Sequence, residues 1–341
     1  MTFDPDDAPT PRLALPWWRR ALAWRPRLSW GGIWGFLLPK GRWWRLAIAL
    51  LLIPVLWYGG GGLWLHRIDD RPDFSSGSVQ AGESNAIAMA VALITREVDD
   101  HHWTPMDPFF LPGAWLDNMP NYQSGIMKAL ARFTVEMRDQ LARARGSSPQ
   151  DPDLDRAASQ LNTDPKQWVW TPSMSLLPTA TATQHYRNGR NGLITYNKRL
   201  AAGQASFERR ADNLQAFLER VAADIGSTSA QIDRHIRDHG GDLLDFHADN
   251  LFYANKGQLY AYFMLLRELG NDFQNILRER ELAGPWMQLM ETFRTAATLQ
   301  PLIVVNGSPD SQMLPSHLVA QGFYLMRART QLREIADILR K

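Results

Sequence analysis

The stretch LAIALLLIPVLWYGGGGLWL, residues 46–65, decides how this 341-residue chain is organised. Its twenty residues carry no charge, and they directly follow the basic run KGRWWR at residues 40–45. A helix rises about 1.5 Å per residue, so this stretch is long enough to cross the roughly 30 Å hydrocarbon core of a bilayer. The sequence therefore predicts a single transmembrane helix at residues 46–65.

The charges on either side of this stretch predict its orientation. Residues 1–45 contain eight Lys or Arg residues and three acidic residues, whereas Arg67 and Arg71 are mixed with three aspartates directly after the stretch. Positively charged flanks remain in the cytoplasm, so we expect the N-terminus inside and residues 66–341 in the periplasm of a bacterium. A cleaved signal peptide is the alternative. The 45-residue leader and the lack of an Ala-x-Ala-like site after Tyr58 favour a retained anchor.

The segment before the stretch is rich in tryptophan and arginine. Nine of the 14 tryptophans lie in the first 64 residues. Such a mixture suits the headgroup layer of a membrane, and it can also bind nucleic acid. Because the segment adjoins the apolar stretch, we expect lipid and no nucleic-acid partner. The residues predicted to lie at the membrane interface are Trp17, Trp18, Arg19, Arg20, Trp24, Arg42, Trp43, Trp44, Arg45, Trp57 and Trp64.

The rest of the chain has the composition of one exported domain. It contains no cysteine, which excludes disulfides, thiol nucleophiles and cysteine metal sites. Residues between the apolar stretch and the first helical pattern are rich in Ser, Gly and Asp, as in a linker. We therefore divide the chain into a cytoplasmic membrane-surface segment at 1–45, the transmembrane helix at 46–65, a linker at 66–82 and a periplasmic helical domain at 83–341.

Apolar residues at helical spacing predict helices over 84–102 and 122–144. The most regular pattern, with spacings of 4, 3, 4, 3 and 4, consists of Phe207, Ala211, Leu214, Leu218, Val221 and Ile225. These two heptads predict a long helix over 190–225 that packs on a neighbour as in a coiled coil. Gly226 is expected to end this helix, and Thr228 with Gln231 to form a capping box that starts the next one.

The second half of the chain continues the helical pattern. It predicts a long helix across 259–277, another that begins at Gly284 and Pro285, and a last helix with Ser316 as its N-cap. Two stretches, 168–170 and 302–305, have strand character and could pair as a ribbon. The predicted fold class is mainly α: one N-terminal transmembrane helix followed by an elongated helical bundle with coiled-coil-like packing and at most a minor β ribbon.

Two further stretches carry a resemblance to a known family. They are LPTATATQHYRNG at residues 177–189, and PLIVVNGSPDS at residues 301–311 leading into LPSHL at residues 314–318. Both resemble a family of uncharacterised proteobacterial inner-membrane proteins with one N-terminal span, defined only as a domain of unknown function. The resemblance implies a Gram-negative inner membrane. It implies no catalytic residues.

One cluster has the spacing of a metal site. His235 and His239 lie four residues apart, so on a helix they face the same way. Asp242 or Asp245, after a glycine turn, could complete a site of two histidines and one carboxylate. The alternative is a solvated polar helix end, with the acids beginning the next helix at the favourable end of its dipole. A second cluster, Asp99 to His102, is expected to be a helix C-terminus.

Two classes of function follow. Motifs for a serine nucleophile, a phosphate-binding loop and dinucleotide binding are missing from the sequence. The leading hypothesis is therefore a non-enzymatic, membrane-anchored periplasmic scaffold or adaptor, without a cofactor, that binds an envelope protein or self-associates through its helices. The alternative is a metal-dependent periplasmic hydrolase that uses His235, His239 and the nearby acids.

Overall fold

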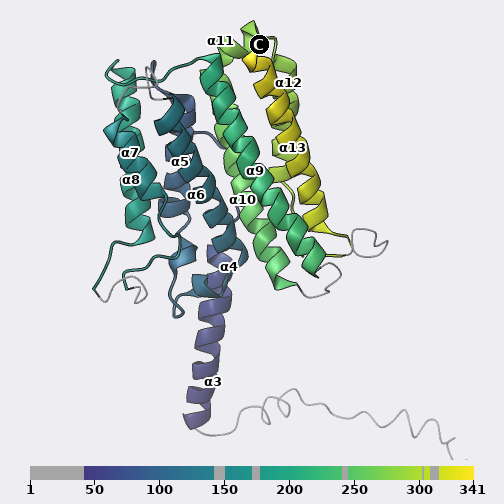
Figure 1. The fold of residues 1–341 in the computed structure, drawn as a ribbon. Coiled ribbons are helices and arrows are strands. Elements are labelled where there is room, and N and C mark those ends of the chain that lie inside the picture. The colour runs from purple at the N-terminus through teal and green to yellow at the C-terminus, as the bar shows by residue number, and fades with distance from the viewer. Residues whose placement is uncertain (1–41, 142–149, 171–176, 240–244, 302, 308–314) are drawn as a thin grey trace, which may run out of the picture. The chain divides into compact units, whose positions relative to one another are not determined.

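The computed structural model describes residues 42–141, 150–170, 177–239, 245–301, 303–307 and 315–341 (Figure 1). The chain forms two compact units, residues 1–55 and 56–341. Five of the predicted membrane-interface residues lie outside the described residues, namely Trp17, Trp18, Arg19, Arg20 and Trp24.

The predicted apolar helix is confirmed. Helix α3, Arg42–Pro54, lies in the first unit. The π-helical turn Val55–Gly60 contains the boundary, and helix α4, Gly61–Leu65, lies in the second unit. Within the described residues, Trp44–Leu65 is one helix long and apolar enough to cross a membrane. Pro54 lacks an N–H group, which removes a hydrogen bond from the helical ladder where the π-helical turn begins.

The second unit is a bundle of helices (Figure 1). Its helices are α5 Asn85–Thr95, α6 Asn118–Glu136, α7 Pro152–Leu161, α8 Ala182–Ala201, α9 Ala211–His239, α10 Phe246–Asp272, α11 Gln274–Glu279, α12 Ala283–Ala297 and α13 His317–Arg340. Single π-helical or 3-10 turns lie at Arg96–Asp100, Thr104–Met106, Pro112–Trp115 and Met137–Leu141. The described residues contain no strand, only one isolated bridge between Asn306 and Ser316. The mainly α fold class is thus confirmed.

Helix α10 forms the centre of the bundle. It packs against α5, α6 and α12, while α9 packs along α13 and α7 along α8 (Figure 1). Every residue of α10 from 255 to 266 is buried. A helix that is apolar almost all round has to be covered on all sides to keep its side chains out of water. The apolar stripes of the outer helices supply this cover.

The long helix predicted over 190–225 is wrong, because the chain forms two helices there. Helix α8 ends at Ala201 and α9 begins at Ala211. Gly203 has a φ of +72°, a left-handed conformation that ends helices and that glycine adopts without strain. Phe207, assigned to the heptads, lies in the connection and packs edge-on against Phe273 at 5.8 Å. The later heptad residues from Leu214 to Ile225 are buried on α9 as expected.

The predicted end of that helix is also wrong. Helix α9 continues through Gly226 to His239. The Thr228 hydroxyl donates to the Asp224 carbonyl one turn earlier, so it does not cap a new helix. Two helix starts agree with the prediction, near residue 84 and at Ser316, whereas α8 begins eight residues before the predicted position 190. Ser84 and Ser316 are N-caps, and Thr181 forms a capping box with Gln184.

The two stretches with strand character do not pair with each other through their described residues. The Val169 carbonyl accepts a hydrogen bond from the Thr179 N–H (2.8 Å), which holds this stretch near the start of α8. The Val305 carbonyl instead accepts from the His317 N–H (3.0 Å) at the start of α13. Each stretch is therefore bound to the helix that follows it in the chain.

Candidate functional site

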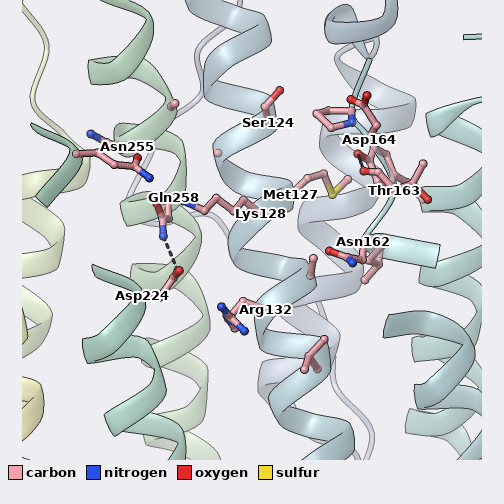
Figure 2. A pocket seen from close by; sticks show the side chains of 18 of the residues that line it. Ser124, Met127, Lys128, Arg132, Asn162, Thr163, Asp164, Asp224, Asn255 and Gln258 are labelled. Atoms are coloured by element: carbon pink, nitrogen blue, oxygen red, sulfur yellow. Dashed lines mark hydrogen bonds between the residues drawn. The ribbon is translucent and has the colours of Figure 1, made fainter. Parts of the chain in front are cut away.

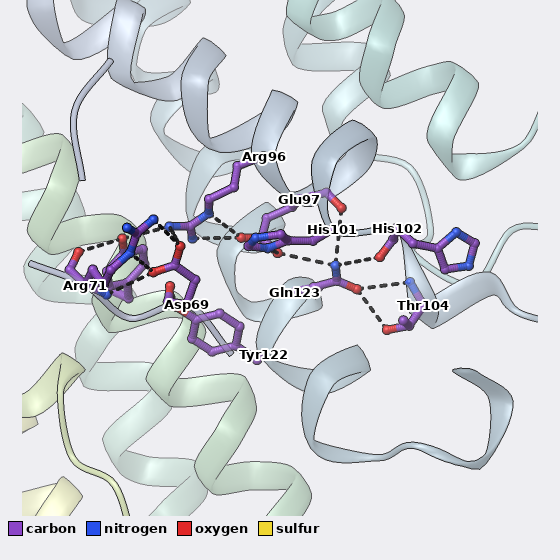
Figure 3. Close-up of polar contacts among 10 residues, drawn as sticks. Asp69, Arg71, Arg96, Glu97, His101, His102, Thr104, Tyr122 and Gln123 are labelled. Atoms are coloured by element: carbon purple, nitrogen blue, oxygen red, sulfur yellow. Dashed lines mark hydrogen bonds and ion pairs between the residues drawn. The ribbon is translucent and has the colours of Figure 1, made fainter. Parts of the chain in front are cut away.

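A network of buried charges joins α5, α6 and α10 to the segment that follows α4 (Figure 3). Arg96 and Glu97 are 3% and 0% exposed, and their side chains form an ion pair of 2.7 Å. Arg96 Nη1 also donates to the Tyr260 hydroxyl (2.9 Å). Burial opposes the charge of Arg96, but Glu97 and Tyr260 outweigh it and raise the pKa of the guanidinium. The Arg96 guanidinium is therefore charged at all physiological pH values.

Gln123 of α6 connects this ion pair to the turn after α5 (Figure 3). Its side-chain oxygen accepts from the backbone N–H and the hydroxyl of Thr104, at 3.0 and 2.8 Å. Its nitrogen donates to the carbonyls of Glu97 and His102, at 3.2 and 3.0 Å. Gln123 is fully buried, and its one side chain satisfies four polar groups: the N–H and hydroxyl of Thr104 and the carbonyls of Glu97 and His102.

A second buried ion pair lies on α10. Lys256 Nζ is 2.7 Å from Asp70 Oδ2 and also donates to the Leu299 carbonyl. The Gln300 amide donates to both Asp70 oxygens, at 2.9 and 2.8 Å. Lys256 is only 1% exposed, and burial lowers its pKa although Asp70 acts in the opposite direction. Neither pair was predicted. The only sequence feature that could have indicated the second pair is Lys256, the single charged residue between positions 251 and 266.

These groups fasten residues 69–74, in the segment predicted as a linker, to the bundle. The Tyr122 hydroxyl donates to the Asp69 carbonyl (2.8 Å), and the Tyr260 hydroxyl to the Arg71 carbonyl (3.0 Å). Arg267 donates to the carbonyls of Pro72 and Phe74, both at 2.7 Å. The chain is thus held against α6 and α10 shortly after it leaves α4. The predicted domain boundaries themselves stay a prediction.

A cavity of about 760 Å³ lies on the outer face of α6, between the end of α7 and the helices α9 and α10 (Figure 2). Its wall is mainly apolar on the α6 side, with Met127, Ala131 and Val135. Lys128 and Arg132, four residues apart on α6, are exposed at the same cavity. The cavity therefore combines an apolar wall with two cations.

The α9 and α10 side of this cavity is polar and buried. Asp224 accepts from Gln258 Nε2 (2.5 Å) and from the Tyr262 hydroxyl (2.6 Å). Burial and the Asp224 charge raise the pKa of Tyr262, so the phenol keeps the proton that it donates. Gln258 also accepts from the Thr228 hydroxyl at 3.1 Å. This polar wall satisfies itself, which makes it a rigid surface.

The residues predicted as metal ligands lie at the end of α9. The rings of His235 and His239 are stacked at 4.7 Å, and His235 Nε2 lies 2.6 Å from Asp245 Oδ2. Burial opposes the charge of Asp245, but hydrogen bonds from His235, Ala248 and Asn306 lower its pKa. Asp242 lies outside the described residues. Among the residues that are described, no group of three His, Cys, Asp or Glu side chains is arranged to hold a metal ion. The metal site stays a prediction.

The second histidine cluster is divided among several partners. Asp99 pairs with Arg187 (2.8 Å) and with Arg190 on α8, and both arginines lower the pKa of its carboxyl against the effect of burial. His102 Nε2 lies 2.9 Å from Asp107, which raises the pKa of the imidazole. The Asp99 pairs connect the end of α5 to α8. The His102–Asp107 pair lies at the beginning of the loop that follows.

Three of the predicted interface residues are exposed. Trp44, Trp57 and Trp64 are 44%, 49% and 67% exposed, on the helix that is apolar enough to cross a membrane. Arg42, Trp43 and Arg45 lie on α3. Their placement in a membrane stays a prediction.

The fold defines a class: a mainly α protein with, in the part of the chain that the structure describes, one candidate membrane-spanning helix near the N-terminus. Residues 85–241 match the model of a family described as "Uncharacterized protein conserved in bacteria (DUF2333)". This match confirms the resemblance to an uncharacterised bacterial family, and it includes the first of the two resembling stretches. No curated protein and no solved structure matches the chain. The family description gives no activity, so it transfers no site residues.

Proposed function

We propose that this protein is a non-enzymatic scaffold or adaptor of the bacterial cell envelope. Residues 46–65 anchor it in the inner membrane, the N-terminus is cytoplasmic, and the bundle is periplasmic. The observation that carries the proposal is the cavity on α6, because it is large, open to a partner and built from rigid helices. It takes an apolar segment of an envelope protein that carries acidic groups.

The lining of the cavity supports a binding role. Its volume of about 760 Å³ lies within the range of roughly 300–1,000 Å³ that is common for ligand sites. A groove between helices with an apolar wall accepts the apolar face of a partner helix or peptide. Met127, Ala131 and Val135 supply that wall.

The charges at the cavity support an acidic partner. Lys128 and Arg132 are exposed, and Lys128 Nζ reaches the Gln258 side-chain oxygen at 3.5 Å. Exposed charges at the border of an apolar contact contribute mainly to the rate of association and to the choice of partner. Reversing these two charges is therefore expected to weaken binding without unfolding the bundle.

Crosslinking in living cells tests the proposal. A photoreactive amino acid in place of Val135 is expected to give one adduct, and Lys128→Glu with Arg132→Glu is expected to reduce it. Arg278→Glu with Arg280→Glu is the matched control, since both arginines are exposed on or after α11, away from the cavity. An adduct with the mass of two copies would identify self-association. No adduct, or an equal loss in the control, would contradict the proposal.

The topology is tested separately. Alkaline phosphatase fused after Gly82 is expected to be active, and a fluorescent protein at the same place to be dark. An N-terminal tag should stay on the membrane-bound protein. Loss of the tag by cleavage near Gly62 would contradict the anchor.

The metal-dependent hydrolase is the second candidate. The stacked rings of His235 and His239 and the nearby Asp245 favour it. Its weakness is that Asp245 already occupies His235 Nε2, and that Asp245 also receives hydrogen bonds from the backbone N–H groups of His247 and Ala248. These contacts are those of a helix N-cap.

A further inference from the structure

The loop between α5 and α6 has an exposed apolar surface. Residues 108–116 read PFFLPGAWL and contain no charge. Phe109 is 80% exposed, Trp115 is 73% exposed and Phe110 is 49% exposed. Water-soluble surfaces seldom collect large aromatic side chains in this way, and such a patch indicates a contact with a partner or a membrane.

This loop is bound to the helix that is apolar enough to cross a membrane. Trp57 Nε1 donates to the Phe110 carbonyl and the Tyr58 hydroxyl donates to the Phe109 carbonyl, both at 2.9 Å. The rings of Tyr58 and Trp115 lie 5.0 Å apart. A Cβ atom at Gly61 would lie 2.9 Å from the Pro112 side chain, so glycine allows this close approach. The loop and residues 57–61 form one packed surface.

The position of these contacts along the apolar helix shows how deep the loop would lie in a membrane. Trp57 lies eight residues before Leu65, the end of the candidate span. Eight residues of helix correspond to about 12 Å. A bilayer that covers the apolar run as far as Leu65 therefore also surrounds the loop residues that contact Trp57 and Tyr58.

The backbone of the loop is suited to that environment. Irregular backbone at membrane depth needs internal partners for its polar groups, because lipid offers none. The carbonyls of Phe109 and Phe110 have the partners named above, and those of Pro108, Leu111 and Gly113 accept backbone hydrogen bonds inside the loop. The same bonds satisfy the Trp57 indole and the Tyr58 hydroxyl.

One acidic residue flanks the loop at each end. The Asp107 side chain is 1% exposed and is paired with His102. At the other end, Asp117 is exposed and begins α6, where the chain returns to water.

The Phe110 ring also lies 6.3 Å from Trp168, next to Val169 and Trp170, which are 40% and 58% exposed. The second loop thus extends the apolar surface.

We propose that residues 108–116 insert into the outer leaflet of the membrane, with the lipid bilayer as their partner. This loop is a second membrane contact, besides the span, and it holds the bundle in one orientation on the membrane surface. The proposal rests on the anchor in the proposed function, but it does not depend on the cavity on α6.

Site-directed spin labelling of the full chain in lipid vesicles tests the proposal. The protein has no cysteine, so single labels can be placed through Phe109→Cys and Trp115→Cys. Leu51→Cys, in the span, is the lipid control, and Arg278→Cys, on α11 at the other end of the bundle, is the water control (Figure 1). Collision rates with oxygen and with a water-soluble nickel complex give the depth of each label.

Labels at 109 and 115 are expected to collide with oxygen as at 51, at a depth of roughly 5–10 Å in the headgroup and acyl boundary. A label at Ala114→Cys should follow them, and should move toward water when Phe109→Ser and Trp115→Ser are added. Nickel collisions at 109 and 115, with 51 in lipid, would overturn the loop proposal alone. Loss of collisions with both oxygen and nickel at 109 and 115 would mean that a protein covers the loop. That result would also overturn the loop proposal. Nickel collisions at 51 would overturn the anchor as well.

Discussion

Two polar regions of the bundle differ in how they are assembled. Asp70 and Lys256 are 186 residues apart in the chain, yet they form an ion pair in which the lysine is 1% exposed. His235 and Asp245 are only ten residues apart, and the histidine side chain is 13% exposed. The sequence draws attention to the second region because its residues are close in the chain. The structure shows the first to be more deeply buried.

Spacing in the sequence reveals local clusters of polar residues, whereas burial decides how much such a cluster contributes to the stability of the fold. A buried charge without its partner keeps the whole cost of desolvation. At the partly exposed end of α9, water can replace part of a lost contact. Removing one member should therefore cost much more stability in the first region than in the second.

The largest effect is expected from Lys256→Ala. The change leaves the buried Asp70 carboxylate without its cation, and the free energy of unfolding should fall by about 3–5 kcal/mol. Denaturant unfolding of the full chain in detergent measures it. Lys256→Met combined with Asp70→Asn should recover most of the loss. Arg294→Ala is the control, since its pair with Glu291 is exposed to water and should change the stability far less. Equal losses in both single variants would refute the contrast.

The next effect is expected from Gln123→Leu. Leucine fills a similar volume but leaves the Thr104 N–H and hydroxyl without their acceptor, so stability should fall by about 1–3 kcal/mol. The same unfolding experiment measures the loss. Gln215→Leu, which removes only a contact with the exposed Glu219, is the control. A neutral Gln123→Leu would show that water reaches the turn after α5.

A smaller, pH-dependent effect is expected from Asp249→Asn. Burial, and then the charge of Asp117, raise the pKa of Asp249 from 3.8 to about 6. The folded state thus binds this proton more tightly than the unfolded state, so its contribution to stability is complete below about pH 4 and is lost as the pH rises through 6. Because the group is half-exposed, the variant should gain only about 1 kcal/mol over the parent at pH 7.5.

Melting temperatures of the parent and the variant at pH 4 and pH 7.5 check this sign. Asp233→Asn, an exposed carboxylate on α9, is the control and should change little between the two pH values. Besides Asp117, the neutral Asn118 amide also contacts Asp249. With its nitrogen toward the carboxylates, it donates to Asp117 Oδ1 (3.1 Å) and to Asp249 Oδ2 (2.5 Å). An advantage of the variant that shrinks as pH rises would contradict the raised pKa.

The smallest effect is expected from His235→Ala with His239→Ala. Asp245 keeps its hydrogen bonds from Asn306 and from the start of α10, so the melting temperature should move by only about 2–4 °C, as for a loss near 1 kcal/mol. Elemental analysis of the purified protein should find less than about 0.1 equivalent of metal, as for a helix end that holds no closed ligand set. Stoichiometric zinc that disappears in the variant would instead support the hydrolase.

Part of the candidate sites was accessible from the sequence. Ser316 was recognisable as a helix start because N-caps depend on residues within three positions. The neighbourhood of His235 and Asp245 was recognisable for the same reason. The break after Ala201 was not, because the heptad pattern continues through Phe207 although that ring packs on Phe273. Helix α7 was also not predicted, because its ten residues are too few to show a clear helical spacing of apolar residues.

Properties that depend on neighbouring residues could be predicted from the sequence. These are the apolar helix, the helical stripes, the Ser316 cap and the charge asymmetry around residues 46–65, since each follows from local spacing and composition. Only the tertiary structure decided which distant groups meet. The pairs of Asp70 with Lys256 and of Trp57 with the Phe110 carbonyl, and the cavity on α6, arise from packing between helices. Packing is fixed by the complementarity of whole surfaces, which no short stretch of sequence contains.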